Sequence, residues 1–194
     1  MGVGDCGGGL GIGYRDEGEG SPEALAGVIR SELGDLDVHL AIEPGRWIAA
    51  PAGVLLASVI LRKKVTEGSP FIILDAAMND LLRPSLYEAW HGILPLSAHD
   101  AVLEPEEANV VGPVCETGDT FAQGRSLSPL QRGARVAILD TGAYGAVMSS
   151  TYNARPLAVE VLVEGDRWSV IRPRQKVEEL WTSEILPEGM RVEA

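Results

Sequence analysis

Apolar residues recur at helical spacing near the N-terminus, and the pattern predicts one amphipathic helix. The residues that define its apolar face are Leu25, Val28, Ile29 and Leu33. Ser21 followed by Pro22 is typical of a helix start, and Gly34 is typical of a helix end. The apolar run at residues 38–42 predicts a short buried strand. Residues 5–46 are therefore predicted to form a β/α unit of a parallel α/β architecture.

From about Gly53 the pattern changes to short runs of β-branched residues. These runs predict strands at residues 54–61, 71–75, 110–115, 136–140, 157–164 and 168–172. Their close spacing predicts a second, mainly antiparallel β domain. The intervening segments predict short helical or irregular insertions at 78–90 and 143–152. Residues 177–180, with Trp181, predict a closing helix that ends near Pro187.

The charge of the chain narrows the classes of partner. The net charge is −12, with 16 Lys and Arg against 28 Asp and Glu, so the chain cannot spread a basic face over a nucleic acid. An anionic ligand must therefore be bound locally. Polar and glycine residues interrupt the longest apolar run, residues 48–61, which is too short to span a bilayer. With only two cysteines, Cys6 and Cys115, we expect a soluble protein of the reducing cytoplasm.

Two segments at the ends of the predicted β/α unit favour an anion. Three consecutive glycines, Gly7, Gly8 and Gly9, let backbone N–H groups converge on a phosphate. The segment 43–46 (Glu-Pro-Gly-Arg) follows the next strand, so its amide and the Arg46 guanidinium could bind the same ligand. A flexible loop and a solvated arginine remain the alternatives.

Other candidate residues are ambiguous when each is taken alone. Cys115 could donate a proton and Glu116 could accept an ammonium group, although a structural cysteine beside a surface acid is more common. Arg83 with Tyr87, and likewise Tyr144, could bind a carboxylate or simply pack. The histidines are scattered and none has metal-ligand spacing, so we expect no metal and structural roles for His39, His91 and His99.

Taken in order, these motifs resemble the diaminopimelate decarboxylase family from about residue 5 to residue 187. The motifs that carry the resemblance are the glycine triplet with its Leu-Gly-Ile, the 43–46 turn, and residues 75–87, 112–116, 142–145 and 148–156. The resemblance implies an alanine-racemase-like fold, in which a (β/α)8 barrel that binds pyridoxal 5'-phosphate precedes a mainly antiparallel β domain. Residues 1–56 would then be the last part of the barrel and residues 57–194 the β domain. It also implies a homodimer with shared active sites.

The resemblance also implies residue roles. The cofactor phosphate would be held by Gly7, Gly8, Gly9, Glu43, Pro44, Gly45 and Arg46. The substrate carboxylate would be bound by Arg46, Arg83 and Tyr87, and Tyr144 would lie beside cofactor and substrate. Cys115 would donate the proton and Glu116 would bind the distal ammonium group of meso-2,6-diaminopimelate. The implied reaction releases CO2 and forms L-lysine.

One expected residue is missing. The family's Schiff-base lysine precedes the region of resemblance, and the lysines present, Lys63, Lys64 and Lys176, do not match it. We therefore expect the chain to be the C-terminal part of such an enzyme, inactive alone and prone to association through uncovered apolar faces. Two alternatives remain: a non-catalytic binding or regulatory partner of an intact decarboxylase, and a decarboxylase for ornithine, lysine or another amino acid.

Overall fold

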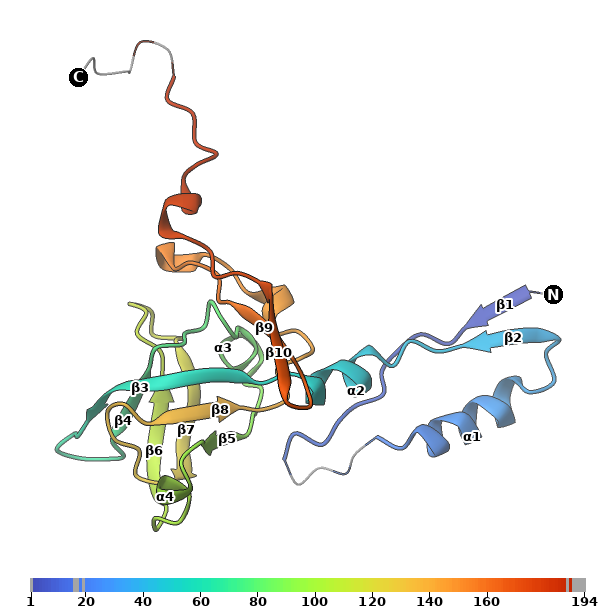
Figure 1. The fold of residues 1–194 in the computed structure, drawn as a ribbon. Coiled ribbons are helices and arrows are strands. Elements are labelled where there is room, and N and C mark those ends of the chain that lie inside the picture. Colours follow the sequence, from blue (N-terminus) through green and yellow to red (C-terminus); the bar gives the residue numbers. More distant parts are fainter. Residues whose placement is uncertain (1, 16–17, 19, 188, 190–194) are drawn as a thin grey trace.

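A six-stranded mixed sheet forms the body of the computed structural model, which describes residues 2–15, 18, 20–187 and 189. The strand order is β5-β8-β3-β4-β6-β7. The strands are β3 (Leu55–Lys63), β4 (Phe71–Leu74), β5 (Ile93–Pro95), β6 (Glu106–Val111), β7 (Thr120–Leu127) and β8 (Arg135–Ile138). β4 and β6 pair parallel and the other neighbours pair antiparallel, so the sheet is mainly antiparallel, as predicted. Figure 1 shows that the sheet is strongly curled.

The inner face of this sheet carries the hydrophobic core. In β4 and β6 alternate residues are buried, as the two-residue period of a strand predicts. The most deeply buried apolar residues of the central strands are Val59, Ile72, Leu74, Val110, Val136 and Ile138. Burying an aliphatic side chain of this size contributes about 1.5–3 kcal/mol, so these residues are the main source of stability in the sheet domain.

A separate β/α unit precedes the sheet and lies to one side of it in Figure 1. It consists of β1 (Gly2–Asp5), α1 (Pro22–Leu33) and β2 (Val38–Ala41), and β1 pairs parallel with β2. The predicted helix start is confirmed, because the Ser21 side chain accepts a hydrogen bond from the Ala24 amide at 3.1 Å. The prediction of a buried strand at 38–42 is wrong, because β2 has no buried residue. α1 has no buried residue either, in line with the expected uncovered apolar faces.

Short elements connect and extend the two parts. After β2 the chain enters α2 (Gly45–Ala49) and η1 (Ala50–Ala52), so Gly45 and Arg46 begin a helical turn. The other short elements lie between strands or after the last strand. They are α3 (Arg83–Tyr87), α4 (Ala98–Ala101), η2 (Ala146–Met148), η3 (Tyr152–Ala154) and η4 (Val177–Leu180). β9 (Glu160–Glu164) and β10 (Arg167–Arg172) form an antiparallel hairpin whose apolar side chains are largely exposed. Within the described ranges, no helix is long and apolar enough to cross a membrane.

The strand predictions fail at identifiable places. β1, β5 and β7 lack a β-branched run and were not predicted. The strand predicted over 110–115 ends at Val111, so Cys115 lies in the following turn and does not end a strand. Gly112 and Pro113 explain this end, because proline cannot donate to the strand ladder.

Candidate active site

The glycine loop and the 43–46 segment lie next to each other at the ends of β1 and β2. The Glu43 amide donates to the Gly7 carbonyl at 2.8 Å. Gly7 and Gly9 have positive φ angles of 70° and 100°, and a Cβ at Gly8 would lie 2.6 Å from the Glu43 carbonyl oxygen. Only glycine fits these positions without strain. The two loops that the sequence suggests for one ligand therefore lie side by side.

Tyr144 joins this group through Arg46. The Arg46 guanidinium lies 5.4 Å from the centroid of the Tyr144 ring, within range of a cation–π contact. The Tyr144 loop is docked onto η1, since the Gly142 amide donates to the Ala50 carbonyl at 3.1 Å. Tyr144 also has a left-handed φ of 60°, a conformation that L-residues seldom adopt. We call Gly7–Gly9, Glu43–Arg46 and Tyr144 the loop group.

Cys115 and Glu116 lie on a tight turn that Asp119 holds from inside. Asp119 is 3% exposed and accepts hydrogen bonds from the Val114 amide at 2.8 Å and from the Met78 amide at 2.7 Å. Burial is the largest influence and raises the pKa of its carboxyl group, while both amide bonds and nearby Arg155 oppose the rise. The turn is therefore bonded both internally and to the segment after β4.

Glu116 points its carboxylate at a phenol. The Tyr152 hydroxyl donates to Glu116 at 3.2 Å. This hydrogen bond, followed by the negative charge of Glu116, raises the pKa of the Tyr152 hydroxyl. Cys115, Glu116 and Tyr152 are exposed, so a thiol, a carboxylate and a phenol are available to a ligand. We call these three residues the thiol group.

A partly buried hydrogen-bond network connects the loops that carry both groups. The Arg155 Nε donates to the Asn79 side chain at 2.8 Å, and its Nη2 donates to the Asp75 carbonyl at 2.6 Å. The Asn79 side chain in turn donates to the Ser150 carbonyl at 3.2 Å. Segment 75–80 is therefore bonded to the loop between Tyr144 and Tyr152, and through Met78 to the Cys115 turn.

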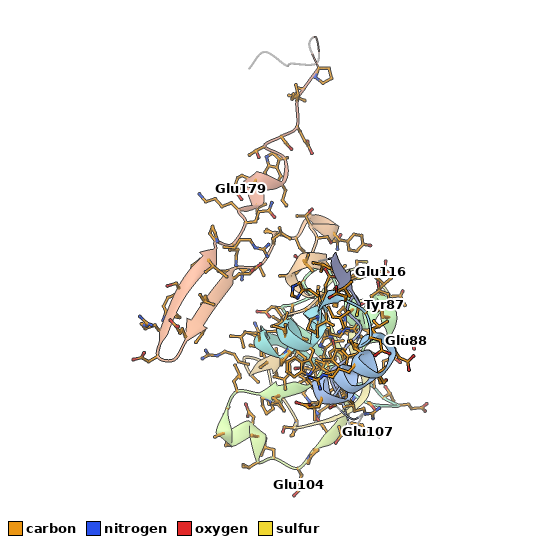
Figure 2. All side chains as sticks on the ribbon, turned by 90° about the vertical axis from the view of Figure 1, so that its right-hand side faces the viewer. Tyr87, Glu88, Glu104, Glu107, Glu116 and Glu179 are labelled. Carbon is orange, nitrogen blue, oxygen red and sulfur yellow. The ribbon has the colours of Figure 1, made fainter. Side chains whose placement is uncertain are left out.

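Arg83 and Tyr87 lie on α3, and only one of them is exposed. Tyr87 is 62% exposed and is labelled in Figure 2. Arg83 is 6% exposed, and its Nη1 lies 2.9 Å from Nε2 of His91. The Arg83 guanidinium also lies 4.8 Å from the centroid of the Tyr14 ring. The predicted carboxylate ligand Arg83 is thus a buried cation held by two aromatic side chains.

The predicted site residues therefore form three sets: the loop group, the thiol group, and Arg83 with Tyr87 on α3. In the described part of the chain, no hydrogen bond or ion pair joins the thiol group to the loop group. The sequence predictions did not include Tyr14, Tyr152, Arg155 and Asn79. Asn79 lies within the motif at 75–87, and Tyr152 and Arg155 lie within the motif at 148–156, so only Tyr14 had no signal. The described residues also contain no cluster of three His, Cys, Asp or Glu side chains that could bind a metal.

No lysine lies at the glycine loop. β3 starts beside η1 and runs away from β1 and β2, so Lys63 at its end, and Lys64 after it, are remote from the loop (Figure 1). Lys176 precedes η4. None of the three lysines is therefore a candidate for the Schiff-base lysine.

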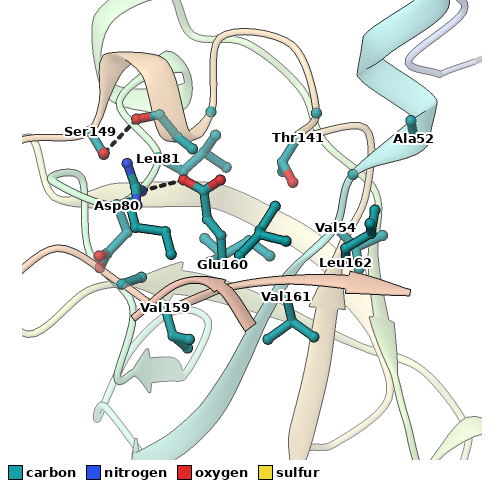
Figure 3. Close-up of a pocket in the computed structure, with 18 of the residues that line it drawn as sticks. Ala52, Val54, Asp80, Leu81, Thr141, Ser149, Val159, Glu160, Val161 and Leu162 are labelled. Carbon is teal, nitrogen blue, oxygen red and sulfur yellow. Dashed lines mark hydrogen bonds and ion pairs between the residues drawn. The ribbon is translucent and has the colours of Figure 1, made fainter. Parts of the chain in front are cut away.

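A cavity of about 410 Å³ lies elsewhere, between the β9–β10 hairpin and the loop at 141–149. Figure 3 shows its lining, which includes Leu81, Val159 and Val161 and the Glu160 carboxylate paired with Arg172. None of the residues predicted to bind cofactor or substrate lines this cavity. We therefore do not assign the cavity to the candidate active site.

Comparison with known proteins first defines the class. The family model for "Pyridoxal-dependent decarboxylase, C-terminal sheet domain" matches residues 28–162. The chain belongs to this family.

Individual proteins similar to this chain narrow the comparison to particular decarboxylases. Diaminopimelate decarboxylases of Zymomonas mobilis and Vibrio cholerae are 47% and 46% identical, over 93% and 95% of this chain. The structure of the Helicobacter pylori diaminopimelate decarboxylase in complex with L-lysine matches with a TM-score of 0.86, at 42% identity over 93% of this chain. A viral arginine decarboxylase, with a TM-score of 0.67 and 24% identity, shares the fold. The chain spans 42–44% of the length of the two curated relatives.

Proposed function

We propose that this chain forms the C-terminal part of a pyridoxal-phosphate-dependent decarboxylase that converts meso-2,6-diaminopimelate to L-lysine and CO2. The observation that carries the proposal is the close similarity to diaminopimelate decarboxylases over nearly the whole chain, 47% identity over 182 residues in one case. The exposed Cys115 and Glu116, with the carboxylate bonded to Tyr152, agree with it.

The β1–α1–β2 unit is proposed to be the last part of a (β/α)8 barrel. Its parallel pairing and its glycine loop at the strand ends support this assignment. We propose the domain division that the sequence predicts, 1–56 and 57–194, near the start of β3. The rest of the barrel would then cover the exposed apolar side chains of α1, such as Val28.

The loop group fits the phosphate of the cofactor. The amides of Gly8 and Gly9 have no hydrogen-bond partner among the described residues, whereas the Gly7 amide donates to Asp5 at 2.8 Å, so Gly7 would shape the loop. Arg46 supplies a cation, and Glu43, Pro44 and Gly45 shape the adjoining turn. Tyr144 would lie beside cofactor and substrate. When bound, pyridoxal phosphate supplies a ring that accepts the electron pair left when the bond to CO2 breaks. Its covalent attachment requires a lysine from outside this chain.

Cys115 is proposed to deliver the proton. Decarboxylation breaks the bond between the α-carbon and its carboxylate, CO2 leaves, and the α-carbon must gain one proton. The Cys115 thiol is exposed on a turn that Asp119 braces, so it can deliver this proton at a defined position. The Cys115 thiolate then regains a proton from solvent.

The remaining residues bind the ends of the substrate. The Glu116 carboxylate would bind the distal ammonium group, and its bond from Tyr152 fixes its direction. Arg46, Arg83 and Tyr87 would bind a carboxylate of the substrate. We also propose that a second copy completes each site in a homodimer, as the resemblance to the family implies. The proposed location is the cytoplasm.

The test is an assay of the chain expressed together with the rest of the barrel as one protein and loaded with cofactor. We expect CO2 release from meso-2,6-diaminopimelate, and much less from ornithine or arginine. Cys115→Ser should lower kcat by roughly 10²–10⁴-fold, the usual contribution of a positioned acid. Glu116→Gln should mainly raise KM for diaminopimelate.

Glu107→Gln is the matched control, because Glu107 is an exposed carboxylate on β6 with no part in the proposed site. It should leave both constants unchanged. Preferred turnover of ornithine would refute the substrate, and an inactive intact protein that still binds a second decarboxylase would favour a regulatory role.

A further inference from the structure

Arg83 is a buried cation that lacks an anionic partner in the described part of the chain. It is 6% exposed, and no carboxylate among the described residues lies within ion-pair distance of its guanidinium. A buried charge is costly unless it is paired. A neutral imidazole and an aromatic face compensate it only in part. The site is therefore built to receive an anion.

The two hydrogen bonds of His91 determine its tautomer. His91 is 1% exposed, its Nδ1 lies 2.8 Å from the Leu139 carbonyl oxygen, and its Nε2 lies 2.9 Å from Nη1 of Arg83. A guanidinium only donates and a carbonyl oxygen only accepts. His91 must therefore donate through Nδ1 and accept through Nε2, which makes it neutral. A protonated ring would direct an N–H group at the N–H group of Arg83.

The Tyr14 ring forms the second support. Tyr14 follows the glycine loop in the sequence, and its ring contacts the Arg83 guanidinium at 4.8 Å and the His91 ring edge-on at 5.3 Å. The Tyr14 hydroxyl is buried and has no hydrogen-bond partner among the residues that the structure describes. The ring, rather than the hydroxyl, therefore makes the useful contact.

We propose that His91 and Tyr14 are positioning residues that hold Arg83 for a substrate carboxylate, an inference that rests on the proposed function. His91 occupies Nη1, and within the described residues Nε and Nη2 of Arg83 have no hydrogen-bond partner. Nε and Nη2 form the edge of a guanidinium that binds a carboxylate through two parallel hydrogen bonds. Tyr14 also links this edge to the loop group, because it belongs to the segment that continues from Gly9.

Two substitutions of His91 separate positioning from simple packing. In His91→Gln, the side-chain oxygen can still accept from Arg83 but the bond to Leu139 is lost. In His91→Asn, the side-chain amide can still donate to Leu139 but cannot reach Arg83. We expect His91→Asn to raise KM for diaminopimelate and the Kd for L-lysine roughly 10-fold or more, the usual effect of a lost bond to a charged group. His91→Gln should stay within about threefold of wild type, with kcat changed less than KM in both.

His99→Gln is the control, because His99 is an exposed histidine on α4. Equal defects in His91→Asn and His91→Gln, or a larger defect in His91→Gln, would overturn the proposal and leave His91 as a packing residue. A wild-type protein that is inactive on diaminopimelate would instead refute the proposed function. In that case ¹⁵N NMR decides the inference: His91 protonated on Nδ1 and neutral at pH 7 supports it, and the opposite tautomer refutes it.

Discussion

In the sheet domain, β3, β4, β6 and β8 each contain buried residues, whereas the β1–α1–β2 unit has no buried residue in α1 or β2. Both regions have regular backbone hydrogen bonds, and α1 has a good N-cap and an apolar face. The difference is therefore not in local structure but in packing. Since helices in proteins gain most of their stability from packing of the apolar face, the two regions should differ strongly in stability.

The same difference separates the two groups of site residues. The thiol group is braced by the buried Asp119 and by the Arg155 network, both anchored on the sheet domain. In the loop group, Gly7–Gly9 and Glu43–Arg46 are supported from the β1–α1–β2 unit, and only Tyr144 comes from the sheet domain. The contacts between the two parts include Arg46 with Tyr144 and Tyr14 with Arg83. In this chain the thiol group should therefore be better ordered than the loop group.

The largest expected difference compares one core residue with one residue of α1. Leu74 is fully buried in β4, whereas Val28 is 60% exposed on α1. Leu74→Ala should lower the free energy of unfolding by about 2–5 kcal/mol, the usual cost of a large-to-small core change. Val28→Ala should change it by less than about 0.5 kcal/mol. Urea unfolding of the chain, followed by near-UV circular dichroism, measures both values.

The same pair tests the proposed barrel. In the intact protein, the rest of the barrel would bury Val28, so Val28→Ala should become clearly destabilising there. Equal effects of Val28→Ala in the chain and in the intact protein would contradict the proposed covering of α1.

A smaller effect is expected at Asp119. Asp119→Ala removes the acceptor for the Val114 and Met78 amides, and each buried amide left unpaired costs about 1–3 kcal/mol. Removing the buried carboxyl group offsets part of this cost, so we expect a net loss of roughly 2 kcal/mol. Hydrogen exchange of residues 112–119 should increase, while exchange in α1 should not change. Asp166→Ala, on the exposed turn of the hairpin, is the control and should have no effect on either region.

The sequence allows the local elements to be predicted better than their burial. The bounds of α1 follow from Ser21, Pro22 and Gly34, and β3 and β4 follow from their β-branched runs. β7 could not be predicted this way, because it is an edge strand with Gly124 and several polar residues. Burial of α1 depends on residues far away in the sequence or outside the chain, and an apolar periodicity cannot show whether a partner is present.

For the candidate site, the sequence allowed the meeting of two loops to be predicted, but not the residues that brace them. The meeting of the glycine loop with residues 43–46 follows from a general rule, because parallel strands end at the same edge of a sheet. The bracing residues do not follow from any local pattern. Met78 and Asp119 are bonded across a separation of 41 residues, and Arg155 and Asp75 across 80. Such pairings depend on how the sheet curls.

Acidification should destabilise the sheet domain through His91. Burial, the largest cause, lowers the pKa of His91, and nearby Arg83 and Arg125 lower it further, against the Leu139 hydrogen bond and Asp140. Below about pH 6.5 an unfolded histidine binds a proton that the folded His91 resists. The free energy of unfolding should therefore be highest above this pH and decrease as the pH falls. Urea unfolding from pH 8 to pH 5.5 measures this slope, which His91→Gln should reduce.

The smallest expected effect is local to α1. Ser21→Ala removes the acceptor for the Ala24 amide and should destabilise the helix by about 0.5–2 kcal/mol. Because α1 packs on no core in this chain, hydrogen exchange within α1 should accelerate while the unfolding midpoint of the sheet domain stays the same. Ser31→Ala, in the same helix, removes no cap and should not accelerate exchange. If Ser21→Ala also lowers that midpoint, the two regions unfold as one cooperative unit, and the few contacts around Tyr14 and Arg46 couple them more strongly than their burial suggests.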